Sequence, residues 1–493
     1  SSHCGSSPPQ PAGPCSPLLR SHPPRAWTAR SMARQGAVER SGSSLRRALG
    51  RGLSAGPARF LLYLATAHGL WRFSVHLRFV LRALTHVTKV PLWAPPVLLW
   101  HFTLAFVRVA WRRLRGAPTS HRWSFLVELF VDGVRPCRSF RENWEQCIDP
   151  AIQTITHLDY MGEVLARLCH PQVSIEFATQ GCPRPVAWVW FEARGPAEEG
   201  APEPVLLYLH GGGFWAFTGR SHLEYAARIV AALRARRCRA RACVVDLRRA
   251  PEHPWPAPLE DAVACYDWLR QGCGCRAEHI VLAGDSAGGG LCLSLLLSLR
   301  DAGKPLPLCA TVVSPFTDLS RPEEQYPEEG ALQKDFVPVA AALVSAQRYA
   351  QGQSPKNPLI SPKYGQLHAL PPVLIQAGQS ELLARDSVEY AQRLEAYGGA
   401  VRLEMYPDMP HIFPMLAPLG LQDAKTAIAR QAHFVQDVLA GGGRSEGAAR
   451  RRPRLRVLVH DNRTHSFEDV RDAAGKPQRM ASFGSSPALA ERP

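Results

Sequence analysis

One stretch of the sequence carries a side chain suited to attack on a carbonyl group. Ser286 stands between Gly284 and Gly288, at the end of a short apolar run. Glycines on both sides allow a turn so tight that the serine hydroxyl stands clear of the backbone. The small residues that follow begin an expected helix, whose positive end would point at the same hydroxyl. Because G-x-S-x-G also occurs by chance, the motif alone leaves a plain structural turn open.

An acyl-transfer serine needs an oxyanion hole, a base and a carboxylate that orients the base. Residues 210–213 read His-Gly-Gly-Gly and follow an apolar run at 205–209. Consecutive glycine amides, with no side chains to block approach, suit the stabilisation of a developing oxyanion. A flexible turn is the alternative interpretation of this run.

Two carboxylates follow the apolar run 373–377. Glu381 lies closer to the end of this expected strand, whereas Asp386 falls at the start of the next helix. Chemistry in parallel sheets is placed after the carboxyl ends of strands, while a first-turn acid commonly serves the helix dipole. We therefore favour Glu381 as the orienting acid and keep Asp386 as the alternative.

The candidate base is His411, in a loop after the apolar run 401–406. A loop histidine is usually a solvated side chain. Here, however, the chain order Ser286, Glu381, His411 is the nucleophile, acid, base order of α/β-hydrolases, which makes coincidence a poor explanation.

The elements around these residues alternate. Residues 121–171 have helical periodicity, and helical stretches separate most of the β-type runs that follow. These runs are residues 173–178, 185–192, 204–209, 242–246, 279–284, 308–313, 372–377 and 401–406. The pattern predicts an α/β fold with a mostly parallel eight-stranded sheet and helices on both faces. We assign the catalytic domain to residues 120–440.

The net charge of +16 is not spread along the chain. Residues 1–120 hold 17 of the 58 Lys and Arg residues and only one of the 42 acidic residues, so the remainder is balanced. The domain therefore has no bias towards nucleic acid. Residues 1–57 and 441–493 have the polar, Arg-rich composition of a disordered basic arm and a disordered tail.

Residues 58–119 are hydrophobic and predict membrane association through residues 58–115, as a spanning or in-plane segment. The uncharged run 90–107 is at the short edge of a bilayer span, and arginines and tryptophans flank it. A buried helical hairpin is the alternative. Thirteen cysteines with no repeated spacing favour a reducing compartment. We expect a membrane-associated protein with a cytosolic catalytic domain, with the endoplasmic reticulum membrane as one site. Organelle targeting by the Arg/Ser-rich N-terminal residues is the alternative.

With these residues identified, the chain resembles the hormone-sensitive-lipase-like branch of the α/β-hydrolases, known for its Gly-Asp-x-Gly signature. The resemblance covers residues ~120–440 and rests on 210–214, 284–289, 248–257 (Arg-Arg-Ala-Pro-Glu-His-Pro-Trp-Pro-Ala) and 314–318 (Ser-Pro-Phe-Thr-Asp). Leu247 and Arg249 stand where the family expects Tyr and Leu, and Glu381 where it often has Asp.

The resemblance implies oxyanion amides from Gly212, Gly213 and Ala287, and a helical cap formed near residues 120–170 and 321–365. It also implies hydrolysis of a small-molecule or lipid ester through an acyl-enzyme, with no metal or cofactor. An amidase or deacetylase on the same triad is one alternative, and carbamate hydrolysis is a smaller variation. A ligand-binding homologue without catalysis and a membrane scaffold are the others. The oligomeric state cannot be predicted.

Overall fold

The computed structural model describes residues 94–134, 159–191, 203–328, 330–441, 456–460 and 467–469. The expected basic arm at 1–57 lies outside these residues. So do residues 58–93 of the expected membrane-associated segment, residues 135–158 of the expected cap, and most of the expected tail.

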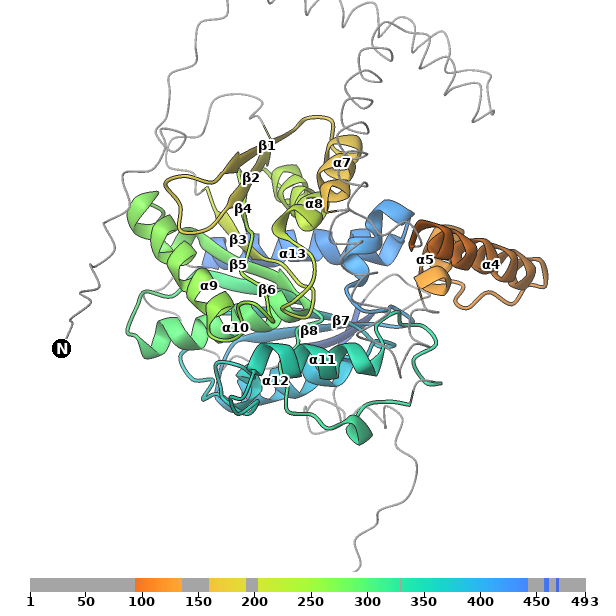
Figure 1. Cartoon of the computed structure of the whole chain (residues 1–493). Coiled ribbons are helices and arrows are strands. Elements are labelled where there is room, and N and C mark those ends of the chain that lie inside the picture. The colour runs from red at the N-terminus through yellow and green to blue at the C-terminus, as the bar shows by residue number, and fades with distance from the viewer. Residues whose placement is uncertain are drawn as a thin grey trace, which may run out of the picture. The chain divides into compact units, whose positions relative to one another are not determined.

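A ten-stranded sheet forms the centre of the described fold (Figure 1), in the order β1-β2-β4-β3-β5-β6-β7-β8-β9-β10. From β4 and β3 through to β9, neighbouring strands run parallel. At one end β1 and β2 are antiparallel, and at the other end β10 is. The strands are β1 (Val173–Ala178), β2 (Val186–Phe191), β3 (Val205–Leu209), β4 (Arg241–Val245), β5 (Ile280–Asp285), β6 (Cys309–Val313), β7 (Val373–Gly378), β8 (Val401–Tyr406), β9 (Arg456–His460) and β10 (Phe467–Asp469).

The eight expected strands are confirmed as β1 to β8, each within one residue of its expected bounds. The expected tail at 441–493 is not wholly without structure, because it supplies β9 and β10. Strand β9 pairs with β8, with Leu403 opposite Val457 and Met405 opposite Val459. An open edge of β8 would leave its backbone groups unpaired, and β9 satisfies them.

Helices cover both faces of the sheet, as expected (Figure 1). On one face lie α9 (Ala257–Asp267), α10 (Ser286–Asp301) and α12 (Ala384–Ala396), and on the other α7 (Tyr160–Cys169), α8 (Leu223–Ala235) and α13 (Gln422–Gly441). Alternate residues of β3 serve the two cores: Leu207 and Leu209 pack on the first side, Leu206 and Tyr208 on the second. Because successive side chains of a strand point to opposite faces, a strand covered on both sides is apolar throughout. A further helix, α11 (Val339–Ala350), follows β6 in the expected cap segment.

Helices α4 (Ala94–Leu114) and α5 (Phe125–Val134) form a hairpin. Glu128 of α5 is 1% exposed and accepts hydrogen bonds from Arg112 and Arg113 of α4. A buried carboxylate is tolerated when it is paired in this way, so these ion pairs fix α4 against α5. Among the described residues, no helix has both the length and the apolar composition that crossing a bilayer demands.

Candidate active site

Ser286 lies where β5 ends and α10 begins. Its φ of +52° is in the left-handed region, which L-residues adopt at a cost of about 1–3 kcal/mol. The surrounding backbone can pack this closely because the residues two positions away on either side, Gly284 and Gly288, lack side chains. A Cβ on Gly288 would lie 2.1 Å from the Leu209 carbonyl oxygen, and one on Gly284 would lie 2.7 Å from the Gly288 carbonyl oxygen. The turn has the strained geometry that exposes a nucleophile at the top of such a sheet.

His411 lies in the loop after β8, next to Ser286. Its Nε2 is 2.9 Å from the Ser286 Oγ, within hydrogen-bond distance. The His411 residue is only 3% exposed, so it is not a solvated loop histidine.

Glu381, in the loop after β7, faces the other side of the His411 ring. Its Oε1 lies 3.7 Å from His411 Nδ1, slightly beyond hydrogen-bond length, and neither atom bonds to any other atom of the described residues. The other oxygen, Oε2, accepts hydrogen bonds from Ser314 Oγ at 2.7 Å and the Gly378 amide at 2.9 Å. Three side chains therefore lie in line: hydroxyl, imidazole and carboxylate.

The electrostatics of the pair follow from burial and proximity. Burial is the largest single effect and lowers the pKa of His411, but the facing Glu381 carboxylate, together with Asp335 and Asp285, raises it, and the net shift is upward from 6.5. Burial raises the pKa of Glu381, and the His411 ring only partly opposes that shift. An imidazolium is thus stabilised where it would form.

Asp386, the alternative acid, has other partners. One carboxylate oxygen accepts hydrogen bonds from the Thr317 and Asp318 amides, both at 2.9 Å. The other oxygen pairs with Arg321 Nη1 at 2.7 Å. Asp386 therefore secures the segment after β6, whereas Glu381 is the carboxylate that faces His411.

The glycine run after β3 folds back beside the Ser286 turn. Gly212 and Gly213 have φ values of +114° and +61°. A Cβ on Gly212 would lie 2.1 Å from the Ala216 carbonyl oxygen, and one on Gly213 would lie 2.2 Å from Ser345 Oγ of α11. Ala287 occupies the first turn of α10, where backbone N–H groups have no partner within the helix. Positions 212 and 213 therefore need glycine for conformation as well as for access.

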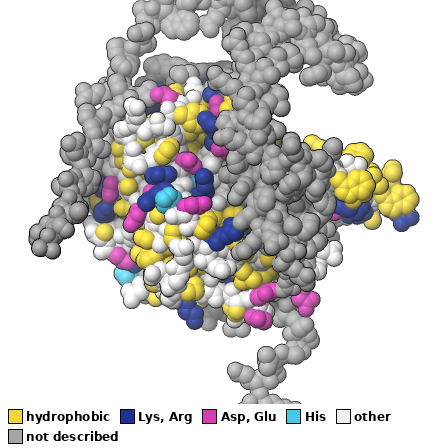
Figure 2. Space-filling view, in the orientation of Figure 1, with side chains coloured by type: hydrophobic (Ala, Val, Ile, Leu, Met, Phe, Trp, Pro, Cys, Tyr) yellow, Lys and Arg dark blue, Asp and Glu magenta, His cyan; other side chains and the backbone are white. Residues whose placement is uncertain are grey.

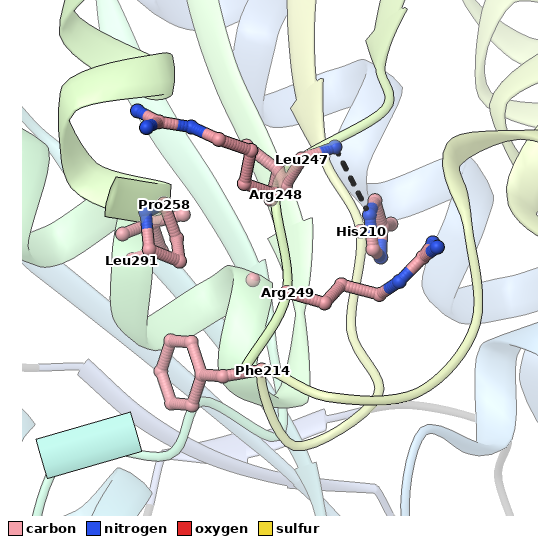
Figure 3. A pocket seen from close by; sticks show the side chains of 8 residues that line it. His210, Phe214, Leu247, Arg248, Arg249, Pro258 and Leu291 are labelled. Atoms are coloured by element: carbon pink, nitrogen blue, oxygen red, sulfur yellow. Dashed lines mark hydrogen bonds between the residues drawn. The ribbon is translucent and has the colours of Figure 1, made fainter. Parts of the chain in front are cut away.

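A small pocket behind this run is shown in Figure 3, lined by His210, Phe214, Leu247, Arg248, Arg249, Pro258, Gly288 and Leu291. The Leu247 amide donates to His210 Nε2 at 3.4 Å, the dashed line of Figure 3. The ring proton must then lie on Nδ1, which is 2.8 Å from the Gly211 carbonyl oxygen. Burial and the neighbouring His222 lower the pKa of His210 to about 4, so the ring is neutral. Neutral His210 ties the glycine run to the segment after β4.

Leu247 and Arg249, the two departures from the family pattern, both contribute here. Leu247 is buried and supplies the amide to His210, and Arg249 donates from Nη1 to the Phe217 carbonyl oxygen at 2.7 Å. Both residues therefore support the glycine run.

Asp285, directly before the serine, joins the two motifs. Its Oδ1 accepts hydrogen bonds from Tyr208 Oη at 2.6 Å and from the Gly211 amide at 3.1 Å, and it lies 3.5 Å from His222 Nε2. Burial raises the pKa of Asp285, but His222 and the hydrogen bonds from Tyr208 and Gly211 together lower it, and the net shift is downward. Burial lowers the pKa of His222, but Asp285 and the Thr218 carbonyl together raise it, and the net shift is upward. The hydrogen bond from the Gly211 amide thus fastens the glycine run to the Ser286 turn, and the buried His222–Asp285 pair fastens the segment that follows the run.

Sequence reasoning missed four supporting residues: Asp285 as a link, His222, Ser314 and Asp335. Ser314 begins one of the four family-like segments, which was the only signal for it. Asp335 accepts the backbone amides of Leu382 and His411, at 2.7 Å and 3.0 Å. Nothing in the local sequence distinguishes it from a solvated acid. Within the described part of the chain, no three His, Cys, Asp or Glu side chains are grouped to hold a metal ion.

Known proteins share this fold and these sequence features. Residues 206–415 match a family model described as alpha/beta hydrolase fold. An acetyl-hydrolase of Streptomyces hygroscopicus is 37% identical over 240 residues, covering 48% of this chain and 77% of the relative. A carboxylesterase/phospholipase, LipF, of Mycobacterium tuberculosis is 34% identical, covering 48% of this chain and 62% of the relative.

Solved structures of esterases also resemble this chain. An esterase from the bacterial hormone-sensitive lipase family has a TM-score of 0.51 and 31% identity, covering 63% of this chain and 98% of its own. A mutant of the esterase E40 has a TM-score of 0.52 and 32% identity, with the same two coverages.

The fold and the site define the class of α/β-hydrolases. Within that class, the chain belongs to the hormone-sensitive-lipase-like family. It is therefore an enzyme of the group that hydrolyses ester bonds, the carboxylesterases and lipases.

Proposed function

We propose that the chain hydrolyses carboxylic esters through an acyl-enzyme on Ser286, with His411 as general base and Glu381 as the orienting acid. The observation that carries this proposal is the 2.9 Å contact between His411 Nε2 and Ser286 Oγ, with Glu381 facing the opposite ring nitrogen. Nucleophile, base and orienting acid within reach of one another are the recurring arrangement for acyl transfer.

In the first step His411 removes the Ser286 proton while the oxygen attacks the ester carbonyl. The resulting oxyanion accepts hydrogen bonds from the amides of Gly212, Gly213 and Ala287. Each donor aimed at such an oxyanion lowers the barrier by about 2.7–4 kcal/mol. The tetrahedral intermediate then collapses, and His411 delivers the proton to the departing alcohol oxygen.

In the second step water takes the place of the alcohol. His411 removes a proton from water as the oxygen attacks the acyl-enzyme carbonyl, and returns it to Ser286 as the acid product leaves. Glu381 holds the imidazole with its proton on Nδ1 and stabilises the imidazolium in both steps. The upward pKa shift of His411 supports this role.

A short-chain p-nitrophenyl ester tests the proposal. We expect the Ser286→Ala variant to lose turnover on the order of 10⁶-fold, down to the residual rate of binding and the oxyanion hole. Ser294→Ala is the matched control, because Ser294 is a buried serine further along α10. It should keep the wild-type rate within about twofold. Turnover that survives in Ser286→Ala would contradict the proposal.

The alcohol and acyl groups of the substrate are a separate question. One relative is named carboxylesterase/phospholipase, which supports an ester bond, and another is named acetyl-hydrolase, which supports a short acyl group without specifying the bond. We propose a membrane-partitioning ester such as a glyceride or sterol ester, because of the apolar surface of α4.

Helix α4 carries an apolar stripe of Trp100, Leu104, Val107, Trp111 and Leu114, here named the α4 stripe. The spacing of four and three places these residues on one helical face, and they are 36–83% exposed. Figure 2 shows hydrophobic side chains gathered over α4, with basic side chains beside them. Tryptophans and arginines around an apolar stripe suit an interfacial helix.

We propose that the α4 stripe lies in the surface of a bilayer containing anionic lipid. The charge of the neighbouring sequence supports this partner, since residues 1–120 hold 17 basic residues and one acidic residue. The cytosolic position of the catalytic domain stays a prediction.

A further inference from the structure

Asp335 is a buried carboxylate in the segment that precedes α11. It is 0% exposed, and three backbone amides donate to it. Its Oδ2 accepts the Leu382 amide at 2.7 Å, and its Oδ1 accepts the His411 amide at 3.0 Å and the Phe336 amide at 2.8 Å. Hydrogen bonds to an ionised acceptor are about twice as strong as neutral ones, so one side chain makes three strong bonds.

Two of these amides belong to the loops that carry the acid and the base. One is the amide of Leu382, which directly follows Glu381, and the other is that of His411 itself. The loops leave different strands, β7 and β8, at the same edge of the sheet. Asp335 therefore links the backbones of both loops through a single carboxylate.

Ser314 makes a second link between the same loops. Its hydroxyl donates to Glu381 Oε2 at 2.7 Å and accepts the Ile412 amide at 3.1 Å. The two links leave Glu381 Oε1 and His411 Nδ1 3.7 Å apart. A small shift of either loop would lengthen this gap further, and a misplacement of about 1 Å can cost about 100-fold in rate.

We propose that Asp335 is a positioning residue, which holds the Glu381 and His411 loops in register and places a second negative charge behind the imidazole. The inference rests on the proposed function, since it assigns a role relative to that triad. Asp335 does not touch the reacting atoms and acts only through the two loops.

The negative charge of Asp335 has an electrostatic effect that is separate from its effect on the positions of the two loops. The charged groups that face His411 are Glu381, Asp335 and Asp285, and each raises the pKa of the ring against the effect of burial. The Ser286 hydroxyl and the Phe336 ring, whose centroid is 6.4 Å from the imidazole, are its uncharged neighbours. Removal of the Asp335 charge should lower the pKa of His411.

The test uses two substitutions in the full chain. Asp335→Asn removes the charge. It also replaces one of the two acceptor oxygens with an NH₂ group, which cannot accept a hydrogen bond from a backbone amide. Asp335→Glu keeps the charge but lengthens the side chain. Asp386→Asn is the matched control, because Asp386 is also 0% exposed and also accepts two backbone amides, yet it faces Arg321 rather than His411.

For Asp335→Asn we expect kcat to fall about 10- to 100-fold with KM changed less than about threefold. The acid limb of kcat/KM should move to lower pH, because a less basic imidazole stays neutral further into acid. Asp335→Glu should lower kcat but keep the limb at the wild-type pH. Asp386→Asn should keep the limb at the wild-type pH, whatever its loss of thermal stability.

Two results would overturn the inference: a wild-type kcat in both Asp335 variants, or a lowered kcat in Asp335→Asn with an unmoved acid limb. If Asp335→Asn does not fold, the Glu variant decides, since a wild-type kcat there would contradict the positioning role. Ser286→Ala, assayed alongside, separates the two levels. Wild-type turnover in Ser286→Ala would overturn the proposed function. The Asp335 variants are compared with the wild-type rate, so their outcome bears only on the positioning role.

Discussion

The pKa of His411 is set by two opposing effects, the burial of its ring and the nearby carboxylates. Burial alone would make its ring too weak a base, because desolvation disfavours the charged form. The Glu381 carboxylate 3.7 Å away, with smaller contributions from Asp335 and Asp285, opposes this effect, and the pKa has a net upward shift. The same carboxylate selects the tautomer whose unprotonated Nε2 faces Ser286. Glu381 thus contributes both to the basicity and to the orientation of the proposed base.

A pH profile measures this balance. The base must be neutral to accept the Ser286 proton, so kcat/KM should fall as the pH drops through the pKa of His411 in the free enzyme. Because that pKa is raised, the midpoint of the acid limb should lie above 6.5. A midpoint at or below 6.5, from kcat/KM against pH for a p-nitrophenyl ester, would contradict the assigned electrostatics.

The choice between the two carboxylates is also a residue-scale prediction. Glu381→Gln should lower kcat on the order of 10³- to 10⁴-fold, because the amide no longer selects the tautomer. Asp386→Asn should lower it less than about tenfold, since Asp386 pairs with Arg321 and the amides after β6. Steady-state kinetics of both variants provide the comparison. A large loss in the Asp386 variant alone would reverse the assignment.

At the scale of elements, the site depends on turns that only glycine can make. The β5–α10 turn and the run after β3 approach one another so closely that Gly288 contacts the backbone of Leu209 and His210. Asp285, which precedes Ser286, and His222, which follows the glycine run, also form a buried ion pair. The glycine run and the Ser286 turn are therefore one packed unit.

Gly288→Ala should break this unit. Its Cβ would lie 2.1 Å from the Leu209 carbonyl oxygen and 2.5 Å from the His210 carbonyl oxygen, so the backbone must shift. We expect a loss of about 3 kcal/mol in the free energy of unfolding, measured by urea denaturation. Gly330→Ala is the control, as its Cβ would meet no atom within 4 Å, and it should change the value by less than about 0.5 kcal/mol. Equal stability of the two variants would contradict the packing described.

The sequence predicted the elements better than their connections. Strands β1 to β8 were predictable because fully buried strands are continuous apolar runs. The proximity of Ser286, Glu381 and His411 was predictable because each follows such a run, and their catalytic roles stay a prediction. Ser314 and Asp335 were not, because their partners lie far along the chain and no local pattern encodes such a contact. Strand β9 was missed because its short run lies within an Arg-rich stretch that lacks the composition of a core.

At the scale of the whole molecule, the described surface combines the catalytic domain with a helix that exposes an apolar stripe. The α4 stripe lies opposite the face that α4 packs on α5, where Ala105 and Val109 are fully buried. The arginines on the α5 side are held by Glu128 and Asp132. The stripe is thus presented outward by a rigid hairpin, as a surface-binding helix requires.

Flotation of the full chain with phosphatidylserine-containing vesicles tests this partner. Replacing both Trp100 and Trp111 with Ser should weaken binding at least about tenfold, because two indole side chains lose their apolar burial. Tyr397→Ser is the control, since Tyr397 directly follows α12, is 42% exposed and lies outside the stripe. Unchanged flotation of the double variant would contradict a membrane partner. So would a loss of self-association in place of a loss of vesicle binding.

The central claim is a nucleophilic Ser286, and a fluorophosphonate tests it most directly. The serine oxygen should form a bond to phosphorus as fluoride leaves, so the intact mass should rise by one phosphonyl group, carried by the peptide that contains Ser286. His411→Ala should slow this labelling by several orders of magnitude, on the order of 10³-fold or more. No mass increase, or an adduct on another residue with Ser286 unmodified, would contradict the account.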